Sequence, residues 1–276
     1  MNTKLLNCAY RGSNARILGP AIVASLVAVV STDAYAGLVV GPNVNISRAA
    51  GYQAEEAIAI NPTNPMNLFA FSNTSGNALF GATSFDGGTT WATRLVATGT
   101  DIRAACCDPS TQFDRFGNLF ITYVDSGRAA VNVAASANGG MTFTNVAQFA
   151  AADQPTIVTG PSNVAGNSST WVTYLNSTST SIAARGASVT GLGAIGAFSA
   201  ADQLAPGSGG GNFGDIVVGP GGKVEVTYQS PSNNAGPSTI FTNLDPDGLG
   251  PTGFGAARTA TATNVGGFAP IPPVPR

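Results

Sequence analysis

Acidic residues stand at the start of four strand-like stretches of this sequence, and they are the side chains most suited to chemistry. They are Glu55 with Glu56, Asp108, Asp153 and Asp215. Carboxylates that gather in one place repel one another unless a cation, bound sugar hydroxyls or raised pKa values make the cluster tolerable. We therefore expect a site for a hard cation such as calcium, or for a polar glycan-like ligand, if the fold brings these residues together. The alternative is that each acid caps its own turn in solvent.

Histidine is absent from all 276 residues. This absence excludes a Ser-His-Asp triad, a Cys-His nucleophile pair and any metal centre held by histidine. A serine nucleophile in this chain would need another base.

Of the three cysteines, Cys8 lies near the N-terminus, and Cys106 and Cys107 are neighbours. Adjacent Cα atoms are about 3.8 Å apart, which is shorter than the usual span of a disulfide. The sequence leaves open a vicinal disulfide that stiffens a loop and a pair of free thiols. No spacing around the pair is typical of a metal site or of a redox motif.

Charge is sparse in this chain, since charged residues make up 9% of the sequence and the net charge is −2. A nucleic-acid partner would require a basic face, and so would electrostatic binding to a membrane surface. The composition excludes both classes of function.

The first 36 residues have the pattern of a secretory signal peptide. Basic residues precede an apolar stretch at 17–30, and a small-x-small cleavage site follows at 34–36. We expect a secreted or periplasmic protein with no membrane insertion after cleavage; an uncleaved anchor is the alternative. The expected domains are the leader (1–36), a folded domain (37–262) and a Pro-rich tail (263–276).

A strand-like stretch that ends in an aromatic residue occurs four times at nearly constant spacing. The stretches are 67–71, 118–123, 170–174 and 223–228, and they end in Phe71, Tyr123, Tyr174 and Tyr228. A turn signal rich in Asn, Gly, Pro or Asp precedes each one, so each is predicted to be the second strand of a hairpin.

A second motif repeats in phase with these strands. SFDGGTTW at 84–91 returns as SANGGMTF at 136–143, and weaker copies stand at 188–191 and 243–248. The marked positions of the two good copies are Ser84, Asp86, Gly88 and Trp91, then Ser136, Asn138, Gly140 and Phe143. About 50 residues for each unit allow four strands, the content of a propeller blade. The predicted fold is an all-β propeller of four-stranded antiparallel blades, of which four are recognisable.

The pattern S-x-D-x-G-x-x-W resembles the Asp box of the sialidase-like (BNR repeat) β-propeller superfamily, over residues 50–260. The resemblance implies that the box is a structural turn between the third and fourth strands of a blade, on the face away from the active site. Propellers of this superfamily usually have six blades, so the sequence is expected to be a fragment of a longer propeller. Association through an open blade edge would follow. The alternatives to a fragment are a small ring that a strand at 38–46 closes, and a propeller that two chains form together.

A sialidase would need three arginines for the substrate carboxylate, a Tyr nucleophile paired with Glu, and an Asp acid/base, as the resemblance implies. The family's Phe/Tyr-Arg-Ile-Pro motif is absent, and residues 46–50 read ISRAA. Tyr228 and Glu225 are three residues apart on one predicted strand, so their side chains point to opposite faces. The sequence thus departs from the catalytic pattern.

The Asp boxes mark one face of the predicted propeller, so the five acidic residues are expected at the opposite face, around one mouth of the central channel. Three classes of function remain. The first is an exported propeller that binds a glycan or a cell-surface ligand, the second is an exo-sialidase-type glycoside hydrolase, and the third is a structural propeller with no small-molecule site. Asp245 and Asp247 resemble part of a calcium loop, but a turn accounts for them more simply because the remaining ligands are missing.

Overall fold

The computed structural model of this chain describes Gly41, residues 43–232 and residues 237–263. Contacts divide the chain into two units, Met1–Asn43 and Val44–Arg276, and the strands found among the described residues belong to the second. The predicted leader and the predicted tail beyond Thr263 lie outside the described residues. No helix in the described part of the chain is long and apolar enough to cross a membrane.

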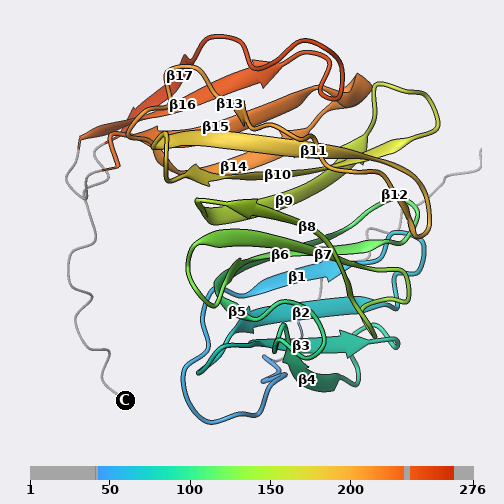
Figure 1. Cartoon of the computed structure of the whole chain (residues 1–276). Helices are drawn as coiled ribbons and strands as arrows, with labels where there is room; N and C mark the ends of the chain where they lie inside the picture. The colour runs from blue at the N-terminus through green and yellow to red at the C-terminus, as the bar shows by residue number, and fades with distance from the viewer. Residues whose placement is uncertain (1–40, 42, 233–236, 264–276) are drawn as a thin grey trace, which may run out of the picture. The chain divides into compact units, whose positions relative to one another are not determined.

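Antiparallel strands form four sheets, each built from consecutive segments of the chain (Figure 1). The first sheet contains β1 (Ala57–Ile60), β2 (Leu68–Asn73), β3 (Leu79–Ser84) and β4 (Ala92–Val96). The second contains β5 (Ala105–Phe113), β6 (Leu119–Asp125), β7 (Ala130–Ser136) and β8 (Thr144–Ala150). The third contains β9 (Ala152–Pro161), β10 (Ser168–Asn176), β11 (Ser181–Gly191), β12 (Ala194–Ile195) and β13 (Gln203–Leu204). The fourth contains β14 (Asn212–Val218), β15 (Val224–Ser230), β16 (Ser238–Asp245) and β17 (Arg258–Thr263), with a 3-10 turn at Pro220–Gly222.

The fold class predicted from the repeats is confirmed: the protein is all-β, and its four antiparallel sheets are arranged as propeller blades. Each sheet runs up and down in chain order, and the first strands contact one another in the order β1, β5, β9 and β14. These four are the inner strands. The inner strand of each blade therefore lies beside the inner strand of the next.

The four aromatic-ended stretches are the second strands β2, β6, β10 and β15, as the repeat predicts. Phe71, Tyr123, Tyr174 and Tyr228 are almost completely buried. Tyr123 donates its hydroxyl to the carbonyl of Arg103 at 2.8 Å, so its polar end is satisfied inside the fold. Aromatic residues recur at this position because each fills the space between one blade and a neighbour.

The apolar core consists of three clusters, one at each contact between successive blades. Phe69 and Leu119 belong to the cluster of the first and second sheets, and Phe120 and Val172 to that of the second and third. Trp171 and Val226 belong to the cluster of the third and fourth sheets. Burial of both faces explains why β2 and β6 are apolar over most of their length.

The third blade differs from the expected four-stranded pattern because its fourth strand is divided. β12 and β13 both pair with β11, and residues 196–202 form an irregular segment between them. Asp202 in this segment accepts hydrogen bonds from Tyr174 Oη at 2.6 Å and from Arg185 Nε at 2.6 Å. These contacts draw the segment towards the blade and interrupt the strand.

Apolar side chains are exposed on the first and last inner strands. Ile58 and Ile60 on β1 are 60% and 58% exposed, and Val217 on β14 is 55% exposed. In the described part of the chain, β1 and β14 stand at the two ends of the series of inner strands. The predicted association through an open blade edge stays a prediction.

Candidate functional site

The first Asp box is a self-contained turn between β3 and β4. Ser84 Oγ donates to Asp86 Oδ1 at 2.8 Å and accepts the N–H of Gly88 at 2.9 Å. Hydrogen bonds from the hydroxyl and the backbone N–H of Thr90 lower the pKa of Asp86 to about 2. Trp91 closes the turn, since its Nε1 donates to the Gly88 carbonyl at 2.9 Å. Every polar group named here has a partner inside the turn, which is the arrangement of a structural element.

The second box repeats these bonds and also joins two blades. Ser136 Oγ donates to Asn138 Oδ1 and accepts the N–H of Gly140. Phe143 packs edge-on against Phe69 of the first sheet, with 5.4 Å between ring centroids. Its aromatic ring thus contacts the preceding blade as well as its own turn.

An asparagine before the second strand of one blade forms hydrogen bonds with the turn that follows the third strand of the next blade. Asn67 Nδ2 donates to the carbonyl of Gly139 at 3.1 Å. One blade further on, Asn118 Nδ2 donates to the Gly191 carbonyl at 3.0 Å, and its Oδ1 accepts the N–H of Gly193 at 2.6 Å. The repeated Asn-Leu-Phe of the sequence is therefore a connection between blades.

The weak fourth copy of the motif is also a turn of the Asp-box kind. Asp245 Oδ1 accepts the N–H groups of Asp247 and Gly248, as Ser84 does in the first box. The Asp247 carboxylate then accepts the hydroxyl and the N–H of Thr252. The simpler explanation of these two acids, a turn, agrees with the contacts.

The candidate site lies at the other end of the strands. Register places Asn73 opposite Leu79 at one end of the β2–β3 pair, and Leu68 opposite Ser84 of the first box at the far end. The inner strand begins beside Asn73, because the Asn73 N–H bonds to the Ala54 carbonyl at 2.9 Å. The starts of the inner strands and the Asp boxes therefore occupy opposite faces of the propeller.

Near the start of each inner strand, one residue lies in the left-handed backbone region, which is unusual for residues other than glycine. At this point the pairing of β5, β9 and β14 with the second strand of the same blade skips one or two residues, and this irregularity is a β-bulge. The left-handed residues are Glu55 (φ 56°), Asp108 (φ 54°), Gln154 (φ 52°) and Phe213 (φ 57°). This conformation costs roughly 1–2 kcal/mol for each residue. Such bulges re-aim side chains and are over-represented next to active sites.

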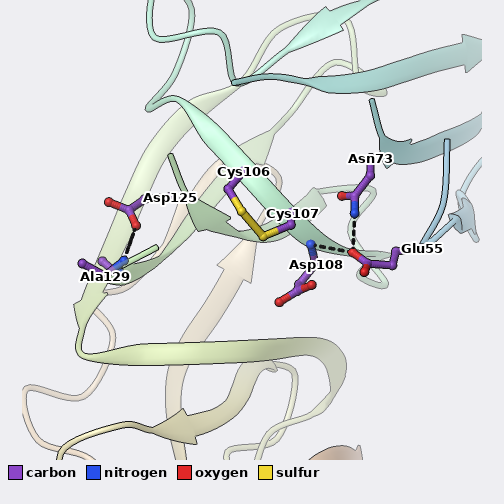
Figure 2. The surroundings of a disulfide bond; sticks show 8 residues. Glu55, Asn73, Cys106, Cys107, Asp108, Asp125 and Ala129 are labelled. Carbon is purple, nitrogen blue, oxygen red and sulfur yellow. Dashed lines mark hydrogen bonds between the residues drawn. A yellow bond between two sulfur atoms is a disulfide. The ribbon is translucent and has the colours of Figure 1, made fainter. Parts of the chain in front are cut away.

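Glu55 connects the first two blades at this point (Figure 2). Its Oε2 accepts the backbone N–H of Asp108 at 2.9 Å and also accepts a hydrogen bond from Asn73 Nδ2. The Asp108 carboxyl in turn accepts the backbone N–H of Gln154, on the third blade. Two successive left-handed residues thus each bond to the backbone of the next blade.

The pKa of Asp108 is raised from 3.8 to about 7. Burial is the largest cause, followed by the hydrogen bond with the Glu55 side chain, the charge of Glu55 and the charge of Asp153; the N–H of Gln154 opposes the shift. Burial and the two neighbouring acids disfavour the ionised form of Asp108, as in other sites where adjacent carboxyls cannot all ionise. Near neutral pH, Asp108 is therefore a hydrogen-bond donor for part of the time.

A hollow of about 570 Å³ surrounds this pair, and we call it the polar hollow. Its lining residues are Tyr52, Glu55, Asn73, Thr74, Gly76, Cys106, Cys107, Asp108, Val124, Arg128, Asp153, Gln154 and Ser177. A second hollow, of about 350 Å³, receives residues from all four inner strands and shares Glu55, Asp108 and Gln154 with the first. The volume of the polar hollow is within the usual range for small-molecule sites.

Three of the five predicted acids, Glu55, Asp108 and Asp153, come together at the polar hollow. Glu56 is exposed and lines the second hollow. Asp215 is exposed too, bonds to the N–H of its neighbour Ile216, and is not among the residues that line either hollow. The bulge explains its position, since Phe213 occupies the place that corresponds to Glu55 and Asp108.

Several lining residues were not predicted from the sequence, among them Tyr52, Asn73, Arg128 and Gln154. A signal for Gln154 was present, because Asp108-Pro109 and Gln154-Pro155 repeat an X-Pro step at the same point of two blades. A weaker signal marked Asn73, which stands two residues after Phe71 as Asp125 and Asn176 stand after Tyr123 and Tyr174, whereas Tyr52 and Arg128 belong to no repeated motif. They reach the polar hollow through the path of the chain alone.

The buried amide of Asn73 has an unmatched oxygen. Its side chain is 5% exposed and lines the polar hollow, and Nδ2 donates to Glu55. Oδ1 accepts no hydrogen bond from any described residue. Buried carbonyl oxygens nearly always have a partner, and an ordered water or a ligand hydroxyl commonly supplies it.

Cys106 and Cys107 form a disulfide, with 3.8 Å between their Cα atoms. This is one of the two forms that the sequence left open. Both residues line the polar hollow and directly precede Asp108. The described residues include no group of three His, Cys, Asp or Glu placed to hold a metal ion, so the calcium hypothesis has no ligand set in that part of the chain.

The residues that a sialidase would need are separated in the structure. Of the described arginines, Arg128 lines the polar hollow, whereas Arg94 bonds to the Gly140 carbonyl and Arg185 bonds to Asp202. Tyr228 is buried in the core against the third sheet, and Glu225, on the opposite face of β15, bonds to Thr242. The predicted separation of Tyr228 from Glu225 is confirmed.

A scan of protein-family models finds no match for this chain, and a search of curated proteins finds none either. Among solved structures, the fold is similar to that of an alpha-L-arabinanase from Penicillium chrysogenum complexed with arabinobiose, at 12% identity and a TM-score of 0.48, over 75% of this chain and 66% of that one. It is also similar to the GH93 alpha-L-arabinofuranosidase of Fusarium graminearum (14% identity, TM-score 0.47, 75% and 66%) and to a Hadza microbial sialidase (14%, 0.45, 77% and 46%). The chain thus spans less than two thirds of the length of each of these proteins. The likeness is distant and concerns the fold alone, and membership of the sialidase-like superfamily stays a prediction.

Proposed function

We propose that this protein is an exported propeller that binds a polyhydroxylated ligand of the carbohydrate class in the polar hollow. The observation that carries the proposal is the neighbouring pair of acids in the polar hollow: Glu55 accepts the Asp108 N–H at 2.9 Å, and the pKa of Asp108 is raised to about 7. A carboxyl that donates beside one that accepts is complementary to a hydroxyl group, which both donates and accepts. Sugars present many such groups on a rigid ring.

The remaining lining side chains supply further partners for hydroxyl groups. Arg128 and Gln154 offer donors, and Asp153 offers acceptor oxygens. Asn73 contributes the oxygen that has no partner among the described residues. A ligand rich in hydroxyls satisfies such a mixed set better than a purely anionic or purely apolar ligand.

Binding accounts for the Glu55–Asp108 pair better than hydrolysis does. The Glu55 carboxylate accepts the backbone N–H of Asp108 at 2.9 Å, and its charge raises the pKa of the Asp108 carboxyl, so the two acids are close neighbours. Two-carboxylate glycosidases keep their carboxyls about 5–5.5 Å apart when they retain configuration and about 6.5–9.5 Å apart when they invert it. A carboxylate tied to the backbone N–H of its neighbour is a poor candidate for a nucleophile or a base across a scissile bond.

A glycan screen with matched variants tests the proposal. Wild-type protein should bind at least one glycan saturably, and Asp108→Asn should weaken this binding at least tenfold because the amide cannot share the proton. Asp215→Asn is the matched control, since it removes an exposed acid of another inner strand and should leave the Kd unchanged. Equal loss in both variants, or no saturable binding by the wild type, would refute the proposal and favour the structural class of propeller.

A second candidate, a sialidase-type glycoside hydrolase, is favoured by one observation. A carboxyl with a pKa near 7 is suited to be a general acid at neutral pH, and Asp153 lies close enough to influence it. Fluorogenic sialosides and arabinofuranosides are the substrates to assay. Release of fluorophore by the wild type that Asp108→Asn abolishes and Asp215→Asn preserves would support this candidate over simple binding.

Export is part of the proposal and has its own test. A disulfide between Cys106 and Cys107 is the form expected in an oxidising compartment. Mass spectrometry of the protein recovered from its native host should find a mature N-terminus at Gly37. A protein that retains Met1 and stays inside the cell would contradict export.

A further inference from the structure

We propose that the Cys106–Cys107 disulfide is an apolar subsite of the polar hollow, against which the C–H face of a sugar ring packs, so that the ligand binds the disulfide form and not the dithiol form. This inference rests on the proposed function and assigns a role to a bond that the hydroxyl-binding groups do not explain.

The disulfide lies directly beside the carboxyl pair. Both cysteines line the polar hollow together with Asp108, the next residue in the chain. Figure 2 shows the bond between the turn that carries Asp125 and Ala129, on one side, and the Glu55–Asp108 pair on the other. A ligand held by the two carboxyls would therefore meet the sulfur atoms.

The local backbone explains how two adjacent cysteines serve one hollow. Side chains of successive residues in a strand point to opposite faces. Cys106 is the extra residue of a bulge, because Ala105 pairs with Asp125 and Cys107 pairs with Val124. The covalent bond then holds both sulfurs on the same side, where they form one continuous surface.

The chemistry of this surface complements the rest of the lining. A disulfide has no hydrogen to donate and no charge, unlike the neighbouring Asp108, Asp153 and Arg128. Tyr52, which is 64% exposed and lines the same hollow, offers a second apolar face. Sugar rings carry polar edges and apolar C–H faces, so carboxyls for the edges and a disulfide with an aromatic ring for the faces make a matched set.

Reduction breaks this one covalent bond of the mature chain. A dithiol such as dithiothreitol transfers two electrons and two protons: the S–S bond breaks, Cys106 and Cys107 become thiols, and the reductant closes into its own cyclic disulfide. The only other cysteine, Cys8, lies in the predicted leader, so the mature chain has no second disulfide to confuse the result. Two separate thiols no longer form one surface. The backbone of the bulge at Cys106 also loses its covalent constraint.

Calorimetric titration of the best glycan from the screen tests the inference. The mature protein should bind in its disulfide form, lose at least tenfold in affinity after reduction by dithiothreitol, and recover after reoxidation. Cys106→Ser/Cys107→Ser should resemble the reduced protein, and Tyr52→Ala should weaken binding as well. A thermal melt that stays cooperative in each form shows that the blades remain folded; if the double variant does not fold, the reversible cycle of the wild type is decisive.

The outcomes separate the inference from the proposal beneath it. Binding that survives reduction unchanged overturns the role of the disulfide and leaves the glycan site intact. Binding by neither form overturns both. Binding that is stronger in the dithiol form also contradicts the subsite, because it would mean that the bond obstructs the ligand.

Discussion

The carboxylate of Glu55, on the first blade, accepts the backbone N–H of Asp108, on the second, at 2.9 Å. Both residues are left-handed residues at the start of inner strands. The bond fixes the entry of one inner strand to that of the next and brings two carboxyls into contact. A strained backbone position and a raised pKa thus occur at the same point, as they often do at functional sites.

The raised pKa of Asp108 predicts how its removal changes stability with pH. Its folded pKa of about 7 lies above the ordinary value of 3.8, so the proton stabilises the fold fully below pH 4 or so, and this contribution is lost as pH rises through about 7. Asp108→Asn cannot ionise. Relative to wild type, this variant should therefore gain free energy of unfolding between pH 4 and pH 8, by about 1–2 kcal/mol after allowance for the partial exposure of the carboxyl.

Urea unfolding at the two pH values measures this gain. Asp215→Asn is again the control, and its difference from wild type should hardly change between them. A gain for Asp108→Asn that is absent, or that has the opposite sign, would mean that Asp108 titrates as an ordinary surface acid.

Replacement of Glu55 tests the coupling within the pair. Glu55→Gln removes the negative charge next to Asp108 and should lower the pKa of Asp108 towards 3.8, although burial keeps it above that value. Carboxyl carbon shifts in an NMR titration report the pKa directly. An unchanged pKa would assign the whole shift to burial and remove Glu55 from the pair.

Asn118 is predicted to stabilise the contact between the second and third blades. Asn118→Ala removes its bonds to Gly191 and Gly193 and leaves both backbone groups short of a partner, so the free energy of unfolding should fall by about 2–3 kcal/mol. Asn77→Ala, at an exposed position, is the matched control and should cost under about 0.5 kcal/mol. If urea unfolding shows the same small loss of free energy for Asn118→Ala and Asn77→Ala, the hydrogen bonds of Asn118 contribute little to the contact between the blades.

The first Asp box is predicted to matter for stability and not for ligand binding. Asp86→Ala removes the acceptor of the Thr90 and Ser84 hydrogen bonds, and the melting temperature should fall. The affinity for the glycan should be unchanged, because the box lies on the opposite face from the polar hollow. A tenfold loss of affinity in a protein that still melts cooperatively would contradict the assignment of the two faces.

Repetition made the architecture predictable from the sequence. The stretches that end in Phe71, Tyr123, Tyr174 and Tyr228 identify the second strand of each blade. The space between blades requires a large side chain at that position. The Asp boxes identified the turns of the first two blades. Even the departure in the third blade, the divided fourth strand, occurs where the motif at 188–191 had already weakened.

The candidate site was less predictable, because it depends on bulges and on residues outside the repeats. The acidic pattern predicts Glu55, Asp108 and Asp153 correctly as neighbours at the strand entries. The same pattern includes Asp215, which lies two residues past the left-handed Phe213 and points elsewhere. A bulge shifts register without any clear signal in composition. Asn73 reaches the polar hollow at the end of β2, at a position that only the faint repeat of Asn73, Asp125 and Asn176 marks.

Carboxyl carbon NMR of the mature, oxidised protein during a glycan titration tests the central claim most directly. The account predicts that the Asp108 and Glu55 resonances shift saturably, with the Kd found by calorimetry, while those of Asp86 and Asp215 stay in place. Shifts at Asp86 or Asp215 without shifts at Asp108 and Glu55 would contradict it, because the ligand would then occupy another face of the propeller.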